Sequence, residues 1–418
     1  MRYRLQVQKT KPGYKIVKPL FGKEIEIPKE WQIDEIQNHA KITTGSKNTQ
    51  DKIEDGKYPF FVRSQKMERI NSYSYDGEAV LTAGDGDIGK VFHYINGKFD
   101  FHQRVYKISD FSNQLDGYFF YLYFSKYFLE RAISMSAKTT VDSIRMDMIT
   151  KMLIPLPTFQ EQKKIASMLG TVDDVINKYD EIIVKTKRLK TGLMQQLLTK
   201  GIGHKKFKKI KLLPQKFLEI PYEWNITTME EVTNLVTYGL TVRPKYIESG
   251  VPLISAREIS GGVIDYESAP KITNDDYKSL LEKCKGKMND IFFSKTGTIG
   301  FVARVEEDRK FAITQNIALL RPNEEKILPA FLELFLRTKL FYSLVVRILN
   351  STTIPDLQLG DLRKMKVFVP KVEEQNKLIE IFSSLKSEEY KTEKRLEYFN
   401  NLKKGLMQKL LTGQIQVN

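Results

Sequence analysis

The chain of 418 residues is poor in the residues that build covalent and metal-based sites. It has one cysteine, Cys284, and four histidines, at positions 39, 93, 102 and 204. A single cysteine excludes a disulfide framework and any zinc site built on cysteine pairs. Cys284 is therefore expected to be a small buried hydrophobic residue in a reducing compartment. The histidines lack the H-E-x-x-H spacing of a zinc protease, so no metal site is predicted.

Long apolar segments are also missing. The sequence has no run of 18 apolar residues, and Met1-Arg2-Tyr3-Arg4 is followed by polar residues instead of the apolar segment of a signal peptide. We therefore expect neither secretion nor a membrane span, and a cytoplasmic location.

Catalytic motifs are absent or incomplete. Residues 84–89 spell G-x-G-x-x-G, but a strand-like segment follows them, whereas a dinucleotide site needs a helix at that point. The corresponding residues 294–300 keep only Gly-x-Ile-Gly, which predicts a tight strand-to-strand turn. A P-loop, a nuclease carboxylate set and the Asn/Asp-Pro-Pro-aromatic motif of DNA amino-methyltransferases are not found. We predict no catalytic residue, no metal ligand and no cofactor in this chain.

Basic residues exceed acidic ones. The chain has 67 Lys and Arg against 51 Asp and Glu, a formal net charge of +16. Such an excess is typical of polyanion binding. A lysine-rich solvated surface without a nucleic-acid partner is the alternative interpretation.

The sequence contains an internal duplication. Residues 157–200 recur at 370–413 without a gap, so that Gln162 matches Gln375 and Gly192 matches Gly405, each 213 residues apart. Ile-Pro-x-Glu-Trp occurs at 27–31 and again at 220–224, 193 residues later. The repeat therefore covers whole halves, and the globular part differs in length between them.

Both copies of the long segment carry apolar residues at alternating spacings of three and four, which is typical of a coiled coil. Extra apolar residues at Val175, Ile182 and Leu189 indicate that the helix also touches a second surface. The seam residues to which we assign coiled-coil packing and subunit docking are Ile165, Leu169, Val172, Ile176, Leu193 and Leu197 in the first copy, and Leu378, Phe382, Leu385, Leu396, Leu406 and Leu410 in the second.

The pattern predicts a globular part and a long helix, twice over. We expect strands near 59–62, 78–81, 90–94, 251–255, 290–294 and 300–303, and helices from 117 and over 329–349. The predicted segments are a basic irregular extension (1–20), an α/β (α+β) domain (21–157), a helix (158–200), a basic solvated linker (201–217), a second such domain (218–370) and a second helix (371–413).

Several motifs occur together in both halves: a strand ending in proline, a Glu-Gln helix start, a Leu-Met-Gln-x-Leu-Leu-Thr helix end, the Ile-Pro-x-Glu-Trp motif and the Gly-x-Ile-Gly turn. In this combination the chain closely resembles the specificity subunit of type I restriction–modification systems. The resemblance implies two target-recognition domains held apart by two long antiparallel helices. It also implies a non-catalytic subunit that reads a bipartite, asymmetric site in double-stranded DNA.

The same resemblance implies partners. Two methylation subunits would dock on the helices and bring S-adenosylmethionine, and restriction subunits that use ATP and Mg²⁺ would join them. A basic coiled-coil scaffold or DNA-binding protein unrelated to DNA modification is the alternative.

Side chains with donors and acceptors for base edges, in turn-rich segments, are the candidates for DNA contact. Gln103 and Gln315 occupy matching places, and a structural hydrogen-bonding role is the alternative for both. The candidates are Arg63, Ser64, Gln65, Lys66, Lys90, Gln103 and Lys138 in the first domain, and Arg243, Lys245, Arg257, Lys295, Thr296 and Gln315 in the second.

Overall fold

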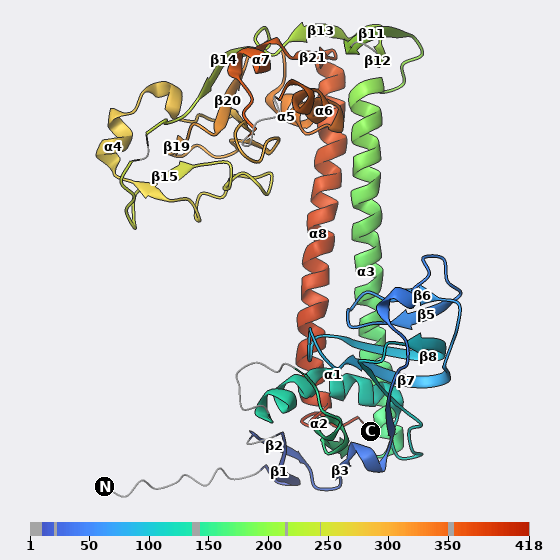
Figure 1. Cartoon of the computed structure of the whole chain (residues 1–418). Helices are drawn as coiled ribbons and strands as arrows, with labels where there is room; N and C mark the ends of the chain where they lie inside the picture. Colours follow the sequence, from blue (N-terminus) through green and yellow to red (C-terminus); the bar gives the residue numbers. More distant parts are fainter. Residues whose placement is uncertain are drawn as a thin grey trace, which may run out of the picture. The chain divides into compact units, whose positions relative to one another are not determined.

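The computed structural model describes residues 11–20, 23–135, 143–213, 216–242, 244–349 and 355–417 (Figure 1). The chain divides into two units, unit 1 (Met1–Asp180 with Lys394–Asn418) and unit 2 (Glu181–Glu393). Two long helices, α3 (Phe159–Lys200) and α8 (Val372–Leu410), contribute one part to each unit. Both helices were predicted, to within a few residues at each end.

Unit 1 is built on a six-stranded sheet with the order β4-β9-β7-β8-β5-β6. Neighbouring strands are antiparallel except β5 and β8, which run parallel. Helix α1 (Gly117–Ser134) begins at Asp116, whose carboxylate accepts the Phe119 N–H, and it buries an aromatic face in the core of the unit. The strands are β4 (Lys41–Thr44), β5 (Tyr58–Phe61), β6 (Glu68–Ile70), β7 (Tyr75–Ala83), β8 (Phe92–Phe101) and β9 (Val105–Ser109).

Unit 2 repeats this plan with its strands divided between two sheets, β14-β20-β17-β18 and β16-β15-β19. The parallel pair recurs, because β15 and β19 match β5 and β8. The strands are β14 (Thr233–Tyr238), β15 (Val251–Ile254), β16 (Lys271–Ile272), β17 (Ile291–Ser294), β18 (Val302–Arg304), β19 (Ala312–Ile313) and β20 (Ile317–Pro322).

The single helix predicted over residues 329–349 is wrong. The structure has two helices there, α5 (Pro329–Leu336) and α6 (Lys339–Ile348). Thr338 interrupts them because its backbone is extended, with ψ of 144°, and its side chain accepts the Phe341 N–H as the N-cap of α6. A threonine inside an apolar run was the signal that the periodicity argument overlooked. Shorter helices, α2 (Met146–Thr150), α4 (Asn274–Ser279) and α7 (Leu359–Lys364), complete the two units.

Two hairpins correct the predictions for residues 1–20 and 201–217. Within the described residues, β1 (Tyr14–Leu20) pairs with β2 (Lys23–Pro28), and β11 (Phe207–Leu213) pairs with β12 (Lys216–Pro221). Both strand pairs are antiparallel, and both show a register shift, between Val17 and Leu20 in one and between Lys211 and Leu213 in the other. Equivalent residues of the two hairpins are 193 positions apart in the sequence. The two copies of the Ile-Pro-x-Glu-Trp motif, which begin at the end of each second strand, have the same separation. The described strands of the basic extension and of the basic linker are therefore the same element of the repeat.

A two-stranded ladder joins the start and the end of each globular part. In unit 1, β3 (Gln32–Glu35) pairs with β10 (Leu153–Leu156); in unit 2, β13 (Asn225–Thr228) pairs with β21 (Lys366–Val369). Each ladder ends just before a proline and the long helix, as predicted. The chain thus enters and leaves each globular part through one ladder.

The Glu-Gln motif at the start of each long helix fixes the helix to its own unit. The buried Gln162 amide donates to the carbonyls of Gln114 and Pro157, and that of Gln375 donates to Pro370. The preceding glutamates accept the indole N–H of buried tryptophans, Glu161 from Trp31 at 3.1 Å and Glu374 from Trp224 at 2.9 Å. Carboxylates in the first turn are also favoured by the helix dipole.

The two long helices pair antiparallel in each unit. In unit 1 the Tyr179 ring stacks on Phe399, with centroids 5.6 Å apart. In unit 2 the Lys187 ammonium lies 3.0 Å from Glu393, and that of Lys190 lies 2.8 Å from Glu389. As the residue numbers rise along α3, those of the contacting residues on α8 fall, so the helices run in opposite directions.

The heptad seam is used for packing inside the chain. Ile165, Leu169 and Leu410 are buried in the core of unit 1, and Leu378 and Phe382 in that of unit 2. Subunit docking therefore stays a prediction, and positions outside the seam suit it better: Met168, Ile182 and Leu189 on α3 are exposed. The other predicted seam residues are partly buried: Val172, Ile176, Leu396 and Leu406 in unit 1, and Leu193, Leu197 and Leu385 in unit 2.

The structure also bears on the predictions for Cys284 and for membrane-spanning helices. Cys284 is buried, as expected of a small hydrophobic residue. In the part of the chain that the structure describes, no helix is long and apolar enough to cross a membrane.

We predict that Leu378→Ala lowers the free energy of unfolding by about 2–5 kcal/mol, because the truncation leaves a cavity in a packed core. The control Leu189→Ala, at a side chain that is 53% exposed, changes it by less than about 0.5 kcal/mol. Urea unfolding followed by circular dichroism measures both. Equal effects of the two substitutions would contradict the observed seam.

Candidate nucleic-acid interface

A glycine turn (residues 84–89 in unit 1, 295–300 in unit 2) connects two strands in each unit. It joins β7 to β8 and β17 to β18, so the predicted strand-to-strand turn is confirmed and no helix opens there. Gly89 and Gly300 have φ values of 68° and 102°, in the region that favours glycine. A Cβ atom on either would also collide with Leu129 or Tyr342.

Isolated β-bridges fasten the glycine turn to neighbouring segments at equivalent places. Asp85 bridges to Ser143 in unit 1, and Thr296 bridges to Asp356 in unit 2. The turn, the connection from β8 to β9 and the segment ahead of α2 thus meet at one edge of unit 1, where the Gly84 N–H donates to the Arg104 carbonyl. A cavity of about 270 Å³ lies there, lined by residues that include Asp85, Gln103 and Arg104.

In unit 1 the structure brings two of the predicted residues to this edge. Arg63 Nη1 lies 3.0 Å from Asp85 Oδ1, and Gln103 donates to Asn48 Oδ1 at 2.6 Å. Arg104, which sequence reasoning missed, places Nη1 2.6 Å from Asp85 Oδ2. Burial opposes ionisation of Asp85, but hydrogen bonds from the two guanidinium groups outweigh it and lower its pKa.

The other candidates of unit 1 lie on the loop after β5 and near the start of β8. The Ser64 hydroxyl donates to the Lys66 carbonyl, and the Gln65 amide donates to the Phe92 carbonyl at 3.4 Å. Lys66 is 78% exposed and lies 3.6 Å from Glu68, and Lys90 is exposed. The predicted contact Lys138 lies outside the described residues.

In unit 2 the predicted contact Lys295 is held by an ion pair within the unit. Its side chain is only 11% exposed, and its ammonium lies 2.5 Å from Asp356 Oδ1. The Thr296 hydroxyl donates to the same carboxylate, and Gln358 donates to Oδ2 at 2.6 Å. Burial opposes ionisation of Asp356, but these donors, Lys295 first, lower its pKa. Lys295 and Thr296 therefore hold the turn, and the exposed Gln358 is a residue that sequence reasoning missed.

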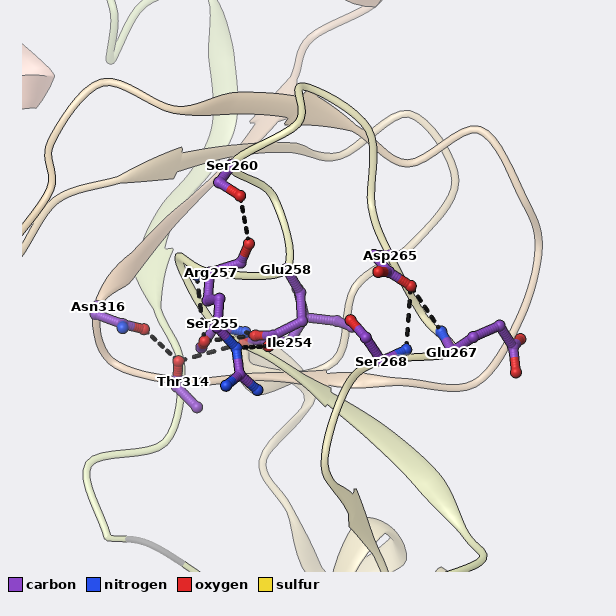
Figure 2. Close-up of polar contacts among 10 residues, drawn as sticks. All are labelled: Ile254, Ser255, Arg257, Glu258, Ser260, Asp265, Glu267, Ser268, Thr314 and Asn316. Carbon is purple, nitrogen blue, oxygen red and sulfur yellow. Dashed lines mark hydrogen bonds and ion pairs between the residues drawn. The ribbon is translucent and has the colours of Figure 1, made fainter. Parts of the chain in front are cut away.

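The Arg257 side chain is exposed but is held by an ion pair through Nε. Its Nε lies 2.7 Å from Glu258 Oε1, and its side chain is 76% exposed (Figure 2). Glu258 is buried, and its Oε2 accepts the Ser255 N–H at 2.9 Å. Ser255 follows β15 as Val62 follows β5, so Arg257 and Arg63 occupy corresponding loops.

Two of the remaining candidates of unit 2, Lys245 and Gln315, are exposed. The Gln315 backbone N–H donates to the Leu240 carbonyl at 2.8 Å, and its side chain faces solvent. Thr314, beside it, donates to the Ile254 carbonyl at 3.2 Å (Figure 2). Lys245 is exposed, and Arg243 lies outside the described residues.

Over the described ranges, no three His, Cys, Asp or Glu side chains gather in a way that would hold a metal ion. The charged groups at the two edges are instead paired carboxylates and cations, an arrangement that orients hydrogen-bond donors.

Comparison with known proteins identifies the family. The model of the type I restriction modification DNA specificity domain matches residues 28–185 and again residues 221–398. These two copies cover most of the chain, and the chain belongs to this family. The predicted class, a specificity subunit with two target-recognition domains, is thereby confirmed.

Individual relatives agree with this assignment. The chain is 24% identical to the type I restriction enzyme MjaVIII specificity subunit of Methanocaldococcus jannaschii, over 94% of this chain and 95% of the relative. It is 27% identical to the EcoBI specificity subunit of Escherichia coli, over 81% and 74% of the two chains. The fold resembles that of the type I restriction–modification S subunit from M. genitalium, with a TM-score of 0.60 at 18% identity, covering 91% of this chain and 96% of the other.

We predict that Asp356→Asn lowers the free energy of unfolding at pH 7 by about 1–3 kcal/mol, because it leaves the Lys295 ammonium without its counter-charge. The pKa of Asp356 is lowered in the folded state, so its contribution is present above the unfolded value of 3.8 and is lost as the pH falls through the folded value. The difference between variant and wild type should therefore shrink below about pH 4.

The control is Asp275→Asn, at a carboxylate that is 94% exposed in an ion pair with Lys278. It should change the free energy of unfolding by less than about 0.5 kcal/mol at any pH. Denaturant titrations at several pH values test both variants. A difference for Asp356→Asn that grows as the pH falls would contradict the ion pair.

Proposed function

We propose that this chain is the sequence-specific DNA-binding subunit of a type I restriction–modification enzyme, in which each globular part reads one half of a bipartite, asymmetric site. One observation carries the proposal. Both units present the same glycine turn and bridge, but different polar side chains hold the bridge carboxylate: Arg63 and Arg104 in unit 1, Lys295 and Gln358 in unit 2. A shared backbone arrangement that carries different donors and acceptors in the two units suits two different half-sites.

The charge of the chain supports DNA as the ligand. A net charge of +16 favours contact with phosphates, which gives affinity that falls with salt and is independent of sequence. Side chains at base edges would then supply the sequence choice. The lysine-rich hairpins β1–β2 and β11–β12 contribute to the positive charge in both halves.

The long helices are proposed to set the spacing of the half-sites. Helix α3 has 42 residues and α8 has 39, and each contributes to both units. At about 1.5 Å per residue, α3 spans about 63 Å. Half-sites on one face of a duplex lie about 34 Å, one helical turn, or a multiple of it apart. A helix of this length is therefore of the right scale for a spacer.

Partner subunits complete the proposal. Two methylation subunits are proposed to dock on the exposed apolar positions of α3, Met168, Ile182 and Leu189, and to carry S-adenosylmethionine. Restriction subunits with ATP and Mg²⁺ would join this complex in the cytoplasm. The chain itself orients the complex on DNA and performs no chemical step.

Inserting one heptad after Asp180 in α3 and a second after Glu393 in α8 should widen the gap between the half-sites and leave their sequences unchanged. Seven residues add about 10 Å of helix, or about three base pairs at 3.4 Å each. Mapping the methylated bases in cells that carry either form measures the gap. A heptad in α3 alone is the control, because it shifts the seam out of register and should abolish methylation. A changed half-site sequence would argue against the spacer role.

The purified chain should bind duplex DNA and transfer no methyl group when supplied with labelled S-adenosylmethionine. Adding the methylation subunits should restore transfer to DNA that contains the bipartite site. The measurement is incorporation of label into DNA, with a duplex lacking the site as the control. Methyl transfer by the chain alone would overturn the non-catalytic assignment.

A further inference from the structure

The bridge beside each glycine turn carries one carboxylate, but on opposite strands in the two units. In unit 1 it is Asp85, on the turn itself and across from Ser143. In unit 2 it is Asp356, across from Thr296 on the turn. The repeat therefore keeps a charged anchor at this edge while it changes the strand that supplies it. The cations that the two anchors hold differ as a result.

In unit 1 the anchor holds two arginines that remain accessible. The Asp85 side chain is 18% exposed, whereas those of Arg63 and Arg104 are 41% and 61% exposed. Each guanidinium contacts the carboxylate through one nitrogen, Nη1. A guanidinium has five N–H donors, so several donors of each group stay available to a ligand. The carboxylate fixes the direction in which they point.

In unit 2 the corresponding cation is withdrawn from the surface. The Lys295 ammonium is held against Asp356, and the place of Arg104 is taken by Asn316. Both residues follow the matched glutamines, Gln103 and Gln315, and both pairs are 212 residues apart. Asn316 is half-buried and accepts a hydrogen bond from Thr314. The residue after the matched glutamine therefore donates to a carboxylate in unit 1 and accepts from a hydroxyl in unit 2.

We propose that Arg104 selects a guanine in the half-site read by unit 1, and that Asp85 is its positioning residue. An arginine fork donates two N–H groups to O6 and N7 of guanine in the major groove, a pattern that the other bases do not offer. Because Asp85 already holds the guanidinium, less side-chain freedom is lost on binding. The assignment rests on the proposed DNA-reading function and adds to it one residue and one base.

The test uses the full chain in complex with its methylation subunits. Initial methylation rates are measured on duplexes that carry each single base-pair change in both half-sites. With Arg104→Ala, the preference for guanine at one position should fall on the order of 10- to 100-fold, and the preferences in the other half-site should stay unchanged. Arg104→Lys, which keeps the charge but not the fork, should lose the same preference.

The positioning role of Asp85 has its own readout. Asp85→Asn should weaken the preference at the same base pair, and combining it with Arg104→Ala should cause no further loss. Asp85→Glu, which keeps the carboxylate, should restore part of the preference. A merely structural role would instead lower the rates on all duplexes alike and leave the base preference intact.

Lys98→Ala is the matched control, because Lys98 is an exposed cation of unit 1 that pairs with Asp76 and not with Asp85. It should leave every base preference unchanged. Equal loss on all duplexes with Arg104→Ala, or no loss at all, would overturn the proposal. If the wild-type complex showed no two-part site, the proposed function itself would fail, and that result is visible before any variant is measured.

Discussion

The hydrogen bond between a buried tryptophan and a glutamate at the start of each long helix is the constraint on which the rest of the structure depends. Trp31 donates to Glu161 and Trp224 donates to Glu374. Each bond ties the hairpin-and-ladder entrance of a globular part to the first turn of the helix that leaves it. Neighbouring Gln162 and Gln375 hold the same turn to buried carbonyls. The globular part is thus attached to its helix by fixed polar contacts as well as by apolar packing.

This attachment fixes each globular part on the long helix that follows it. The helices pair antiparallel through an apolar seam, and ion pairs such as Lys190 with Glu389 add direction to the pairing. The two units differ in where the carboxylate lies at the glycine turn. In unit 1 it is Asp85, on the turn itself, and in unit 2 it is Asp356, on the segment that bridges to the turn. In the proposed function, recognition depends on the orientation of these hydrogen-bond donors.

The sequence predicted the features that depend on local pattern. Both long helices, the proline ends of the ladders and the Gly-x-Ile-Gly turns follow from periodicity and backbone chemistry, and the structure has them all. The hairpins were missed because their many lysines are typical of a linker, and only the pairing between strands shows that they are ordered. The burial of Lys295 could not be predicted, since Asp356 lies 61 residues away and meets it only in the folded unit. Arg104 was missed for the same reason.

The ladders β3–β10 and β13–β21 have a consequence for how such proteins vary. The spacing between equivalent residues rises from 193 at the tryptophans to 213 at the helices, so the two globular parts differ in length while the helices keep one register. Because the chain returns to its starting strand before the helix begins, added or deleted residues inside a globular part do not propagate beyond the ladder. Evolution is therefore free to rebuild one recognition surface while the other surface and the common scaffold keep their geometry.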